Sequence, residues 1–178
     1  MSKDNIILAV DLDNTLIKTD MIFIGLKSLF FKKSYLFPKL LLLLIFKGRT
    51  YAKKFLYDNT QFSVTDIPYN ESVIDFIKTN KKYYIYTILI SGSYYEYVNI
   101  IANHLKIFDY KVGTTLNENM ISMNKVKYIR DKFDNATFDY IGDSVKDIPI
   151  WLHARKAYVV NSAQLKTKLK DIDYISIK

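Results

Sequence analysis

The chain has 178 residues, no cysteine and a formal net charge of +8. This length fits one domain with an insertion, and the lack of cysteine excludes disulfides, thiolate zinc sites and cysteine nucleophiles. The lysines are scattered rather than gathered in one run, so we expect phosphate-bearing partners or an anionic membrane surface, and no nucleic acid. The first residues, 1–5, are polar and give no secretory signal, which favours a cytoplasmic location.

The first predicted strand is an apolar run at 6–10 that ends in two carboxylates, Asp11 and Asp13. Short runs rich in branched residues are typical of buried parallel strands, and catalytic groups of open α/β sheets lie at the carboxyl ends of such strands. Because side chains alternate along a strand, the two carboxylates should point to the same side. A hard divalent cation such as Mg²⁺ would offset their repulsion. Asn14 fits a left-handed turn, and Thr15 is expected to hold that turn by a local hydrogen bond.

The segment 20–66 differs in character and is predicted to be a helical insertion. It contains an unbroken apolar run at 40–46 with lysines on both sides, and Pro38 marks a kink or a helix start. The run is too short to span a bilayer, which needs about 20 residues. Two interpretations remain open: a helical cap that packs on itself and closes the site, or a cap that also meets a membrane or a lipid tail.

A second strand is predicted at 83–90 and is followed by Ser91, Gly92 and Ser93. A hydroxyl and a glycine amide at a strand tip form a small anion-binding corner. The next residues have helical periodicity, so the N-terminus of that helix should point to the same place. Ser93 is its expected N-cap.

A later helix is predicted to begin at Asn124, its expected N-cap. Lys125 would then lie in the first turn, where the helix dipole disfavours a cation. This placement suggests an anionic partner for Lys125, against the ordinary alternative of a solvated lysine.

The strand predicted at 137–142 also ends at a carboxylate, Asp143, with Asp147 one helical turn later. Asp143 is a candidate metal ligand because it lies at a strand tip. Asp147 has capping-box spacing from Ser144 and suits the first turn of a helix. Pro149 is tolerated only near a helix start, so a helix should begin close by.

Four segments resemble, in order and spacing, the motifs of the haloacid dehalogenase (HAD) superfamily. They are Asp11 to Thr15, Ser91 with Gly92, Lys125, and Gly142 to Asp147. A narrower similarity, to the HAD domain fused in front of UbiA-type membrane prenyltransferases, is carried by 11–20, 67–71, 104–109 and 138–151. The prenyltransferase itself is not part of this sequence.

The predicted strands alternate with helices, which indicates an α/β fold with a Rossmann-like parallel sheet. These strands lie near 5–11, 83–90, 110–114, 137–142 and 156–161. The resemblance adds the strand order 5-4-1-2-3 and a small helical C1 cap over the carboxyl edge. The expected domains are a HAD-like core at 1–19 and 67–178 and a cap at 20–66.

The resemblance implies Mg²⁺-dependent hydrolysis of a phosphomonoester through an aspartyl-phosphate. Asp11 would be the nucleophile, and Asp13 would be the general acid and base. The remaining roles are metal binding by Asp11, Asp143 and the Asp13 backbone carbonyl, phosphate binding by Ser91, Gly92 and Lys125, and support by Thr15 and Asp147. Because the dehalogenases of the family lack the second aspartate, Asp13 favours phosphoryl transfer over cleavage of a carbon–halogen bond.

The identity of the substrate is left open by the sequence. The expected partner is a small-molecule or lipid-linked phosphate, for example a prenyl phosphate, and the inner face of the membrane is an alternative location. A HAD phosphomutase and a non-catalytic module that binds lipid or a membrane prenyltransferase are the alternative functions.

Overall fold

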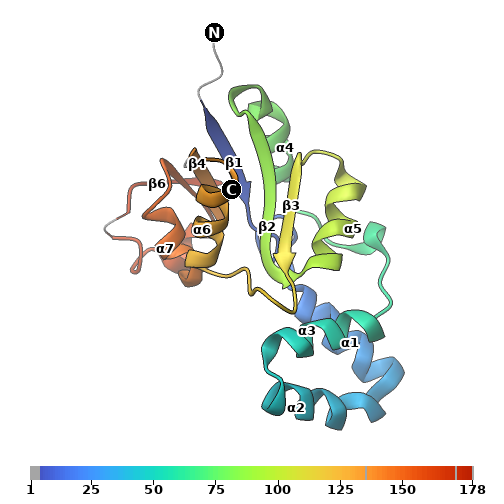
Figure 1. Cartoon of the computed structure of the whole chain (residues 1–178). Coiled ribbons are helices and arrows are strands. Elements are labelled where there is room, and N and C mark those ends of the chain that lie inside the picture. The colour runs from blue at the N-terminus through green and yellow to red at the C-terminus, as the bar shows by residue number, and fades with distance from the viewer. Residues whose placement is uncertain (1–4, 135, 171, 178) are drawn as a thin grey trace.

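A six-stranded parallel sheet forms the centre of the computed structural model, which describes residues 5–134, 136–170 and 172–177 (Figure 1). The strands are β1 (Ile6–Val10), β2 (Tyr86–Tyr94), β3 (Tyr110–Thr114), β4 (Thr137–Gly142), β5 (Lys156–Val160) and β6 (Tyr174–Ile177). Their order is β3-β2-β1-β4-β5-β6. The predicted α/β class is confirmed. The predicted order 5-4-1-2-3 is contained in the sheet but was incomplete, because the short β6 pairs with β5.

Helices cover both faces of this sheet because β1 is apolar at every position and buried on both sides. Leu8 and Val10 pack on one face against α4 (Glu71–Asn80) and α5 (Tyr95–Leu105). Ile7 and Ala9 pack on the other face against α6 (Met123–Lys132), α7 (Ile148–Trp151) and α8 (Ser162–Leu165). The alternation of side chains along β1 therefore divides the core into two layers.

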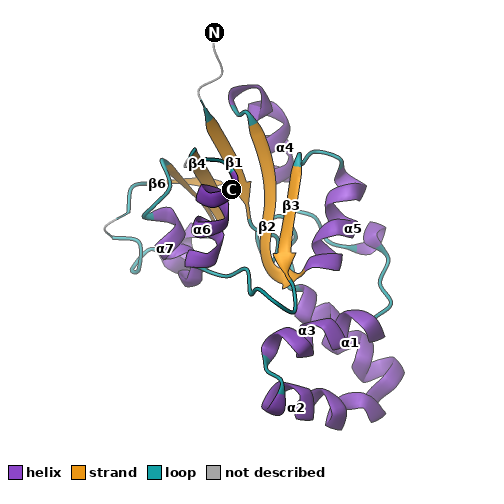
Figure 2. Cartoon of the chain, in the orientation of Figure 1, coloured by secondary structure: helices purple, strands orange, loops and turns teal. Residues whose placement is uncertain are grey.

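Three helices between β1 and α4 form a separate group at one end of the molecule (Figure 2). They are α1 (Met21–Lys33), α2 (Phe37–Phe46) and α3 (Arg49–Asn59). Pro38 lies in the first turn of α2, so it marks a helix start and not a kink. A small core of Leu29, Leu40, Ala52 and Leu56 holds the three helices together.

None of the helices in the described residues is long and apolar enough to cross a bilayer. Short 3-10 turns connect several elements. The turns are η1 (Ser34–Leu36), η2 (Val64–Asp66), η3 (Lys81–Tyr83) and η4 (Val145–Asp147). The predicted core ranges 1–19 and 67–178 also contain residues 1–4, 135, 171 and 178, which lie outside the described residues.

Two predicted helix caps are wrong. β2 continues to Tyr94, so Ser93 lies within the strand, and its hydroxyl bonds Asp13 instead of capping α5. The predicted start of this strand, at residue 83, is also wrong, because residues 81–83 form the η3 turn and β2 begins at Tyr86. α6 begins at Met123, so its N-cap position is Ser122, and Asn124 lies inside the helix, where its side chain donates to the Asn119 carbonyl.

Candidate active site

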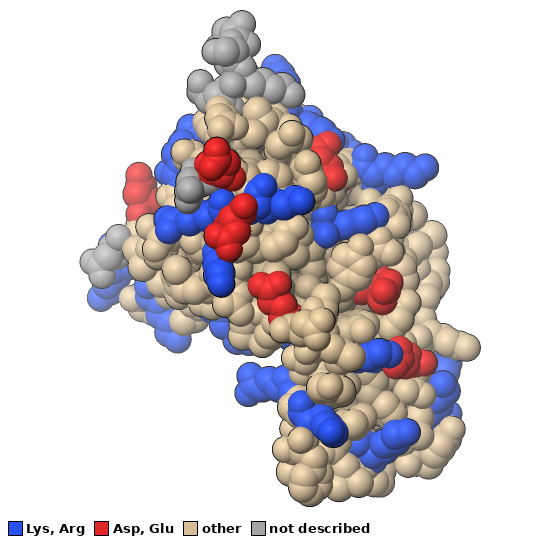
Figure 3. Space-filling view, viewed as in Figure 1, with Lys and Arg blue, Asp and Glu red and all other residues tan. Residues whose placement is uncertain are grey.

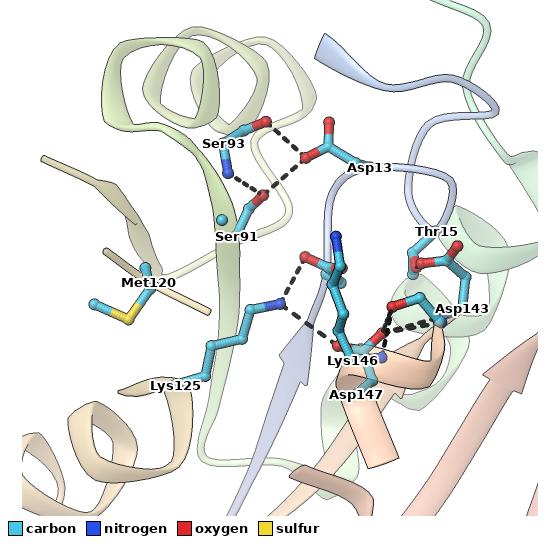
Figure 4. A network of polar contacts seen from close by, with 12 residues as sticks. Asp13, Thr15, Ser91, Ser93, Met120, Lys125, Asp143, Lys146 and Asp147 are labelled. Atoms are coloured by element: carbon cyan, nitrogen blue, oxygen red, sulfur yellow. Dashed lines mark hydrogen bonds and ion pairs between the residues drawn. The ribbon is translucent and has the colours of Figure 1, made fainter. Parts of the chain in front are cut away.

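The carboxyl ends of β1, β2 and β4 and the helix α3 surround a cavity of about 170 Å³. Its walls carry more acids than lysines. The acids are Asp11, Asp13, Asp20, Asp143 and Asp147, and the lysines are Lys53, Lys125 and Lys146. Figure 4 shows how the polar groups of this site lie relative to one another.

Asp11 follows β1 directly and forms a buried ion pair with Lys125. The Lys125 Nζ donates to Asp11 Oδ1 at 2.8 Å. Burial raises the pKa of Asp11 to about 7, although the positive charge of Lys125 opposes that rise. Burial also acts to lower the pKa of Lys125, but the charges of Asp11 and Asp147 outweigh it, and the pKa is raised. The predicted first-turn position of Lys125 is confirmed, and the anionic partner it has in this structure is Asp11.

Lys125 is also held from its other side through Tyr140 and Asp147. Its Nζ donates to Tyr140 Oη at 2.7 Å, and that hydroxyl donates to Asp147 Oδ1 at 2.8 Å. Only glycine fits at Gly142, because a Cβ there would lie 2.7 Å from Asp147 Oδ2. The predicted capping box of Ser144 with Asp147 is confirmed. Asp147 therefore fixes both the start of the turn after β4 and the position of Lys125.

Asp143 lies just beyond β4 and faces the turn that follows β1. Asn14 has a positive φ of 55°, which confirms the predicted left-handed turn. The local hydrogen bond predicted for Thr15 is wrong, because its hydroxyl reaches across to Asp143 Oδ1 at 3.1 Å. Burial, with a contribution from the charge of Asp147, raises the pKa of Asp143 to about 6. The turn after β1 therefore orients the carboxylate that follows β4.

Three carboxylates of the site are close enough to share a cation. One oxygen from each of Asp11, Asp143 and Asp147 lies within 4.8 Å of the others. Carboxylate oxygens are the ligands that Mg²⁺ prefers, and the raised pKa values of Asp11 and Asp143 show that their charges are poorly compensated. The donor set therefore fits a hard divalent cation.

The carboxylate of Asp13 turns away from this group and toward β2. Its Oδ2 accepts hydrogen bonds from Ser93 Oγ at 2.6 Å and from Ser91 Oγ at 3.2 Å. Its Oδ1 accepts from the backbone N–H of Met21 at 2.9 Å. Burial raises the pKa of Asp13, and the charge of Asp20 adds to the effect. A carboxyl group that is oriented by three donors and disposed to hold a proton suits general acid–base catalysis.

The Ser91–Gly92 corner differs in its details from the predicted anion site. Ser91 is completely buried, and its hydroxyl accepts from the backbone N–H of Ser93 at 2.9 Å while it bonds Asp13. Gly92 and Ser93 line the cavity. In this structure the Ser91 hydroxyl therefore positions Asp13, and Ser93, which the sequence assigned only a capping role, shares that task.

Lys53 of α3 is a cavity residue that the sequence did not single out. Its Nζ donates to the Gly92 carbonyl at 2.6 Å and to Asn119 Oδ1 at 3.3 Å. Burial lowers the pKa of Lys53, although the charges of Asp13 and Asp20 oppose this. The sequence pattern does not distinguish Lys53 from its neighbour Lys54, which pairs with Asp58 on the surface. Only the packing of α3 beside β2 shows that Lys53 reaches the site.

No protein-family model matches the chain. The chain is 32% identical over 168 residues to the uncharacterized protein y4nM of Sinorhizobium fredii, and the match covers 92% of this chain. The chain spans only 32% of the length of that curated relative.

Solved structures of HAD hydrolases are similar to the chain over almost its whole length. The HAD family hydrolase t0658 from Salmonella enterica serovar Typhi superimposes with a TM-score of 0.67 at 17% identity, covering 97% of this chain and 68% of that one. A phosphoserine phosphatase, solved as an analogue of its phospho-aspartyl intermediate, superimposes with a TM-score of 0.63 at 17% identity, covering 99% and 95%. The sheet and its helices therefore have the HAD-like fold of these hydrolases.

Proposed function

We propose that the protein is a HAD-type phosphatase that hydrolyses phosphomonoesters through phosphorylation of Asp11. The observation that carries this proposal is the buried Asp11–Lys125 pair, with the carboxylates of Asp13 and Asp143 on the walls of the same cavity. The fold, which the chain shares with a phosphoserine phosphatase solved as a phospho-aspartyl analogue, supports the same reaction.

The proposed reaction has two steps, and both use Asp11 and Asp13. In the first step Asp11 attacks phosphorus in line, the bond from phosphorus to the ester oxygen breaks, and Asp13 protonates that oxygen. In the second step Asp13 takes a proton from water, which attacks the aspartyl-phosphate and releases phosphate and free Asp11. The burial that raises the pKa of Asp13 supports the first step, because a carboxyl group must carry a proton in order to donate one.

Several groups around Asp11 would hold the phosphate oxygens. Lys125 contributes a fixed ammonium, and the Gly92 amide is a proposed neutral donor. The Ser91 hydroxyl, which donates to Asp13 in this structure, would become a second neutral donor by turning toward the phosphate. Because Lys125 bonds Asp11 and Tyr140 at the same time, it is positioned before substrate arrives. Thr15 and Asp147 would support the site by orienting Asp143 and Lys125.

Magnesium is the proposed cofactor, held by Asp11, Asp143 and the backbone carbonyl of Asp13. When bound, it supplies positive charge that offsets the negative charge of the phosphate group. Calcium, whose coordination is looser and higher, should inhibit hydrolysis because it would misplace Asp11.

The substrate class that we propose is an amphiphilic phosphomonoester, such as a lipid-linked or prenyl phosphate. The cavity of about 170 Å³ has room for a phosphate group, and the exposed apolar side chains of Ile22 and Ile121 lie on its wall. A tail that extends past these residues would contact apolar surface. The narrower similarity to the HAD domains of UbiA-type prenyltransferases is part of the same proposal.

Hydrolysis of p-nitrophenyl phosphate with Mg²⁺ tests the reaction. Asp11→Asn should lower kcat by at least about 10³-fold while the circular dichroism spectrum stays unchanged, because an amide does not attack phosphorus. A well-folded Asp11→Asn protein with near-normal turnover would overturn the nucleophile assignment. An inactive wild-type protein would leave the non-catalytic module as the surviving function.

A substrate panel tests the substrate class separately. Farnesyl phosphate should have a higher kcat/KM than phosphoserine or a sugar phosphate. Faster turnover of the soluble phosphates would contradict the lipid proposal without affecting the phosphatase proposal, and an isomerised sugar phosphate as product would identify a mutase.

A further inference from the structure

The outward side of α2 is a surface of large apolar side chains, which we name the α2 face. It consists of Leu41, Leu42, Leu44, Ile45 and Phe46, whose exposed fractions lie between 45% and 75%. Only Leu40 of this helix is buried, and it packs in the small core of the insertion. At helical spacing Leu41, Leu42, Ile45 and Phe46 point away from Leu40, and only Leu44, one turn after it, shares its side. Packing inside the insertion therefore does not explain most of these side chains.

Neighbouring aromatic side chains extend this apolar surface along α1. Phe30 and Phe31 are exposed and their rings lie 5.3 Å apart. Phe30 also contacts Phe37 at the start of α2, with ring centroids 6.3 Å apart. The exposed Tyr35 lies between the two helices in the chain. Exposed apolar side chains that are grouped on neighbouring helices in this way mark an interaction site rather than ordinary scattered exposure.

The same group of helices carries most of the net positive charge of the chain. Between residues 21 and 59 the sequence has eight lysines or arginines and one acid, Asp58. Lys53 points into the catalytic cavity and Lys54 pairs with Asp58. The other six cations form no ion pair within the described part of the chain; they are Lys27, Lys32, Lys33, Lys39, Lys47 and Arg49.

The position of α2 leaves this charged and apolar surface open. The helix lies at the end of the molecule farthest from the sheet (Figure 1). Figure 3 shows lysine and arginine side chains around the tan surface of this end. The described core therefore does not cover the α2 face.

We propose that the α2 face docks the protein on an anionic lipid bilayer, with α2 lying in the plane of the interface. Leu and Phe side chains would enter the boundary between headgroups and acyl chains, while lysines at the rim reach the anionic headgroups. A second copy of this chain is a poorer occupant, because a symmetric contact would bring the same cations together. Docking goes beyond the proposed hydrolysis and does not require it.

Co-sedimentation with vesicles tests this proposal without a substrate. The wild-type protein should sediment with vesicles that contain phosphatidylglycerol at low salt, and much less with pure phosphatidylcholine or at high salt. A lysine near an anionic surface contributes about a fivefold increase in binding, so Lys39→Gln combined with Lys47→Gln should weaken binding about 25-fold. Leu41→Ser combined with Ile45→Ser should weaken it by at least about tenfold.

Matched variants on the core separate docking from general charge and hydrophobicity. Lys78→Gln with Lys82→Gln removes the same charge from the core, and Leu152→Ser with Ile175→Ser removes exposed apolar side chains there. Both should leave vesicle binding unchanged. The proposal is overturned if wild-type protein ignores anionic vesicles, if the core variants lose as much binding as the α2 variants, or if the α2 variants only convert a dimer to a monomer in ultracentrifugation.

Discussion

Strand β4 carries a buried acid, Asp139, and is followed by a half-buried acid, Asp143, and the charges of the two are compensated to different degrees. Asp139 accepts two hydrogen bonds from Arg155, at 2.9 and 2.7 Å, and one from Tyr84 at 2.8 Å. Asp143 instead belongs to a group of three carboxylates around one buried cation, Lys125. The first acid is balanced by a single arginine, whereas the second lies in a group that keeps an excess of negative charge.

This difference is the one expected between an acid that supports the fold and an acid that takes part in chemistry. A buried ion pair with satisfied hydrogen bonds tolerates its burial, whereas uncompensated carboxylates disfavour the folded state until a cation joins them. Sites that hold such charge are typical of catalysis and metal binding. The geometry of β4 therefore predicts that the two acids respond in opposite ways to mutation and to Mg²⁺.

The largest effect on stability should come from Arg155→Met. This substitution leaves the charge of Asp139, which is fully buried, with only Tyr84 as a partner. Although 38% of the Arg155 side chain is exposed, the substitution leaves a fully buried carboxylate without its cation, which lowers the free energy of unfolding by about 3–5 kcal/mol. Urea unfolding measures it, and Arg130→Met, at an exposed position of α6, is the matched control. A loss below about 1 kcal/mol, as for an exposed ion pair, would mean that Asp139 does not depend on Arg155, and the comparison would fail.

A somewhat smaller effect, on activity, is expected from Lys125→Ala. Removing a charged donor from the transition state lowers kcat by about 10²–10³-fold. Lys127→Ala should change kcat less than about twofold, because Lys127 is exposed and lies two residues along the same helix. Steady-state kinetics on both variants decides between the two lysines. A larger loss of kcat for Lys127→Ala than for Lys125→Ala would show that Lys127, and not Lys125, serves the site.

The sheet could be predicted from the sequence because strands and their ends leave local signals. The branched run before Asp11 and the glycine before Asp143 locate β1 and β4 without any knowledge of tertiary contacts. β6 was missed because it has four residues, follows a lysine-rich segment and depends on pairing with β5. The carboxyl end of β2 was misplaced because Ser93 satisfies both capping and strand patterns. Its start was misplaced because Tyr83 and Tyr84, at the end of the η3 turn, have the same high β-propensity as the strand residues.

Within the site, the sequence located the carboxylates but not the groups that orient them. Tyr140 has the apolar alternation expected of a core residue in β4, and nothing local indicates its bonds to Lys125 and Asp147. Lys53 comes from a helix far along the chain from Gly92, so only tertiary packing brings them together. Such contacts depend on how elements pack, which periodicity does not encode.

The smallest expected effect is a change in the Tm of Asp143→Asn, which we predict first without metal and then with Mg²⁺. Burial and Asp147 raise the pKa of Asp143 to about 6, so near neutral pH its ionised form is disfavoured in the folded state relative to the unfolded chain. Without metal, Asp143→Asn should therefore raise the Tm, since it removes a charge that opposes folding. Asp75→Asn, at an exposed position of α4, should leave the Tm unchanged.

With Mg²⁺ the wild-type protein should instead have a higher Tm than Asp143→Asn. At a concentration about 100 times its Kd, Mg²⁺ should stabilise the wild-type protein by about 2.7 kcal/mol. Asp143→Asn should lose most of this gain, because one of the proposed ligands is gone, whereas Asp75→Asn should keep it. Thermal melts in EDTA and in Mg²⁺ at equal ionic strength measure both effects, since matched salt removes general screening. An Asp143→Asn protein that gains as much stability from Mg²⁺ as the wild type would show that the excess charge beyond β4 does not hold the metal.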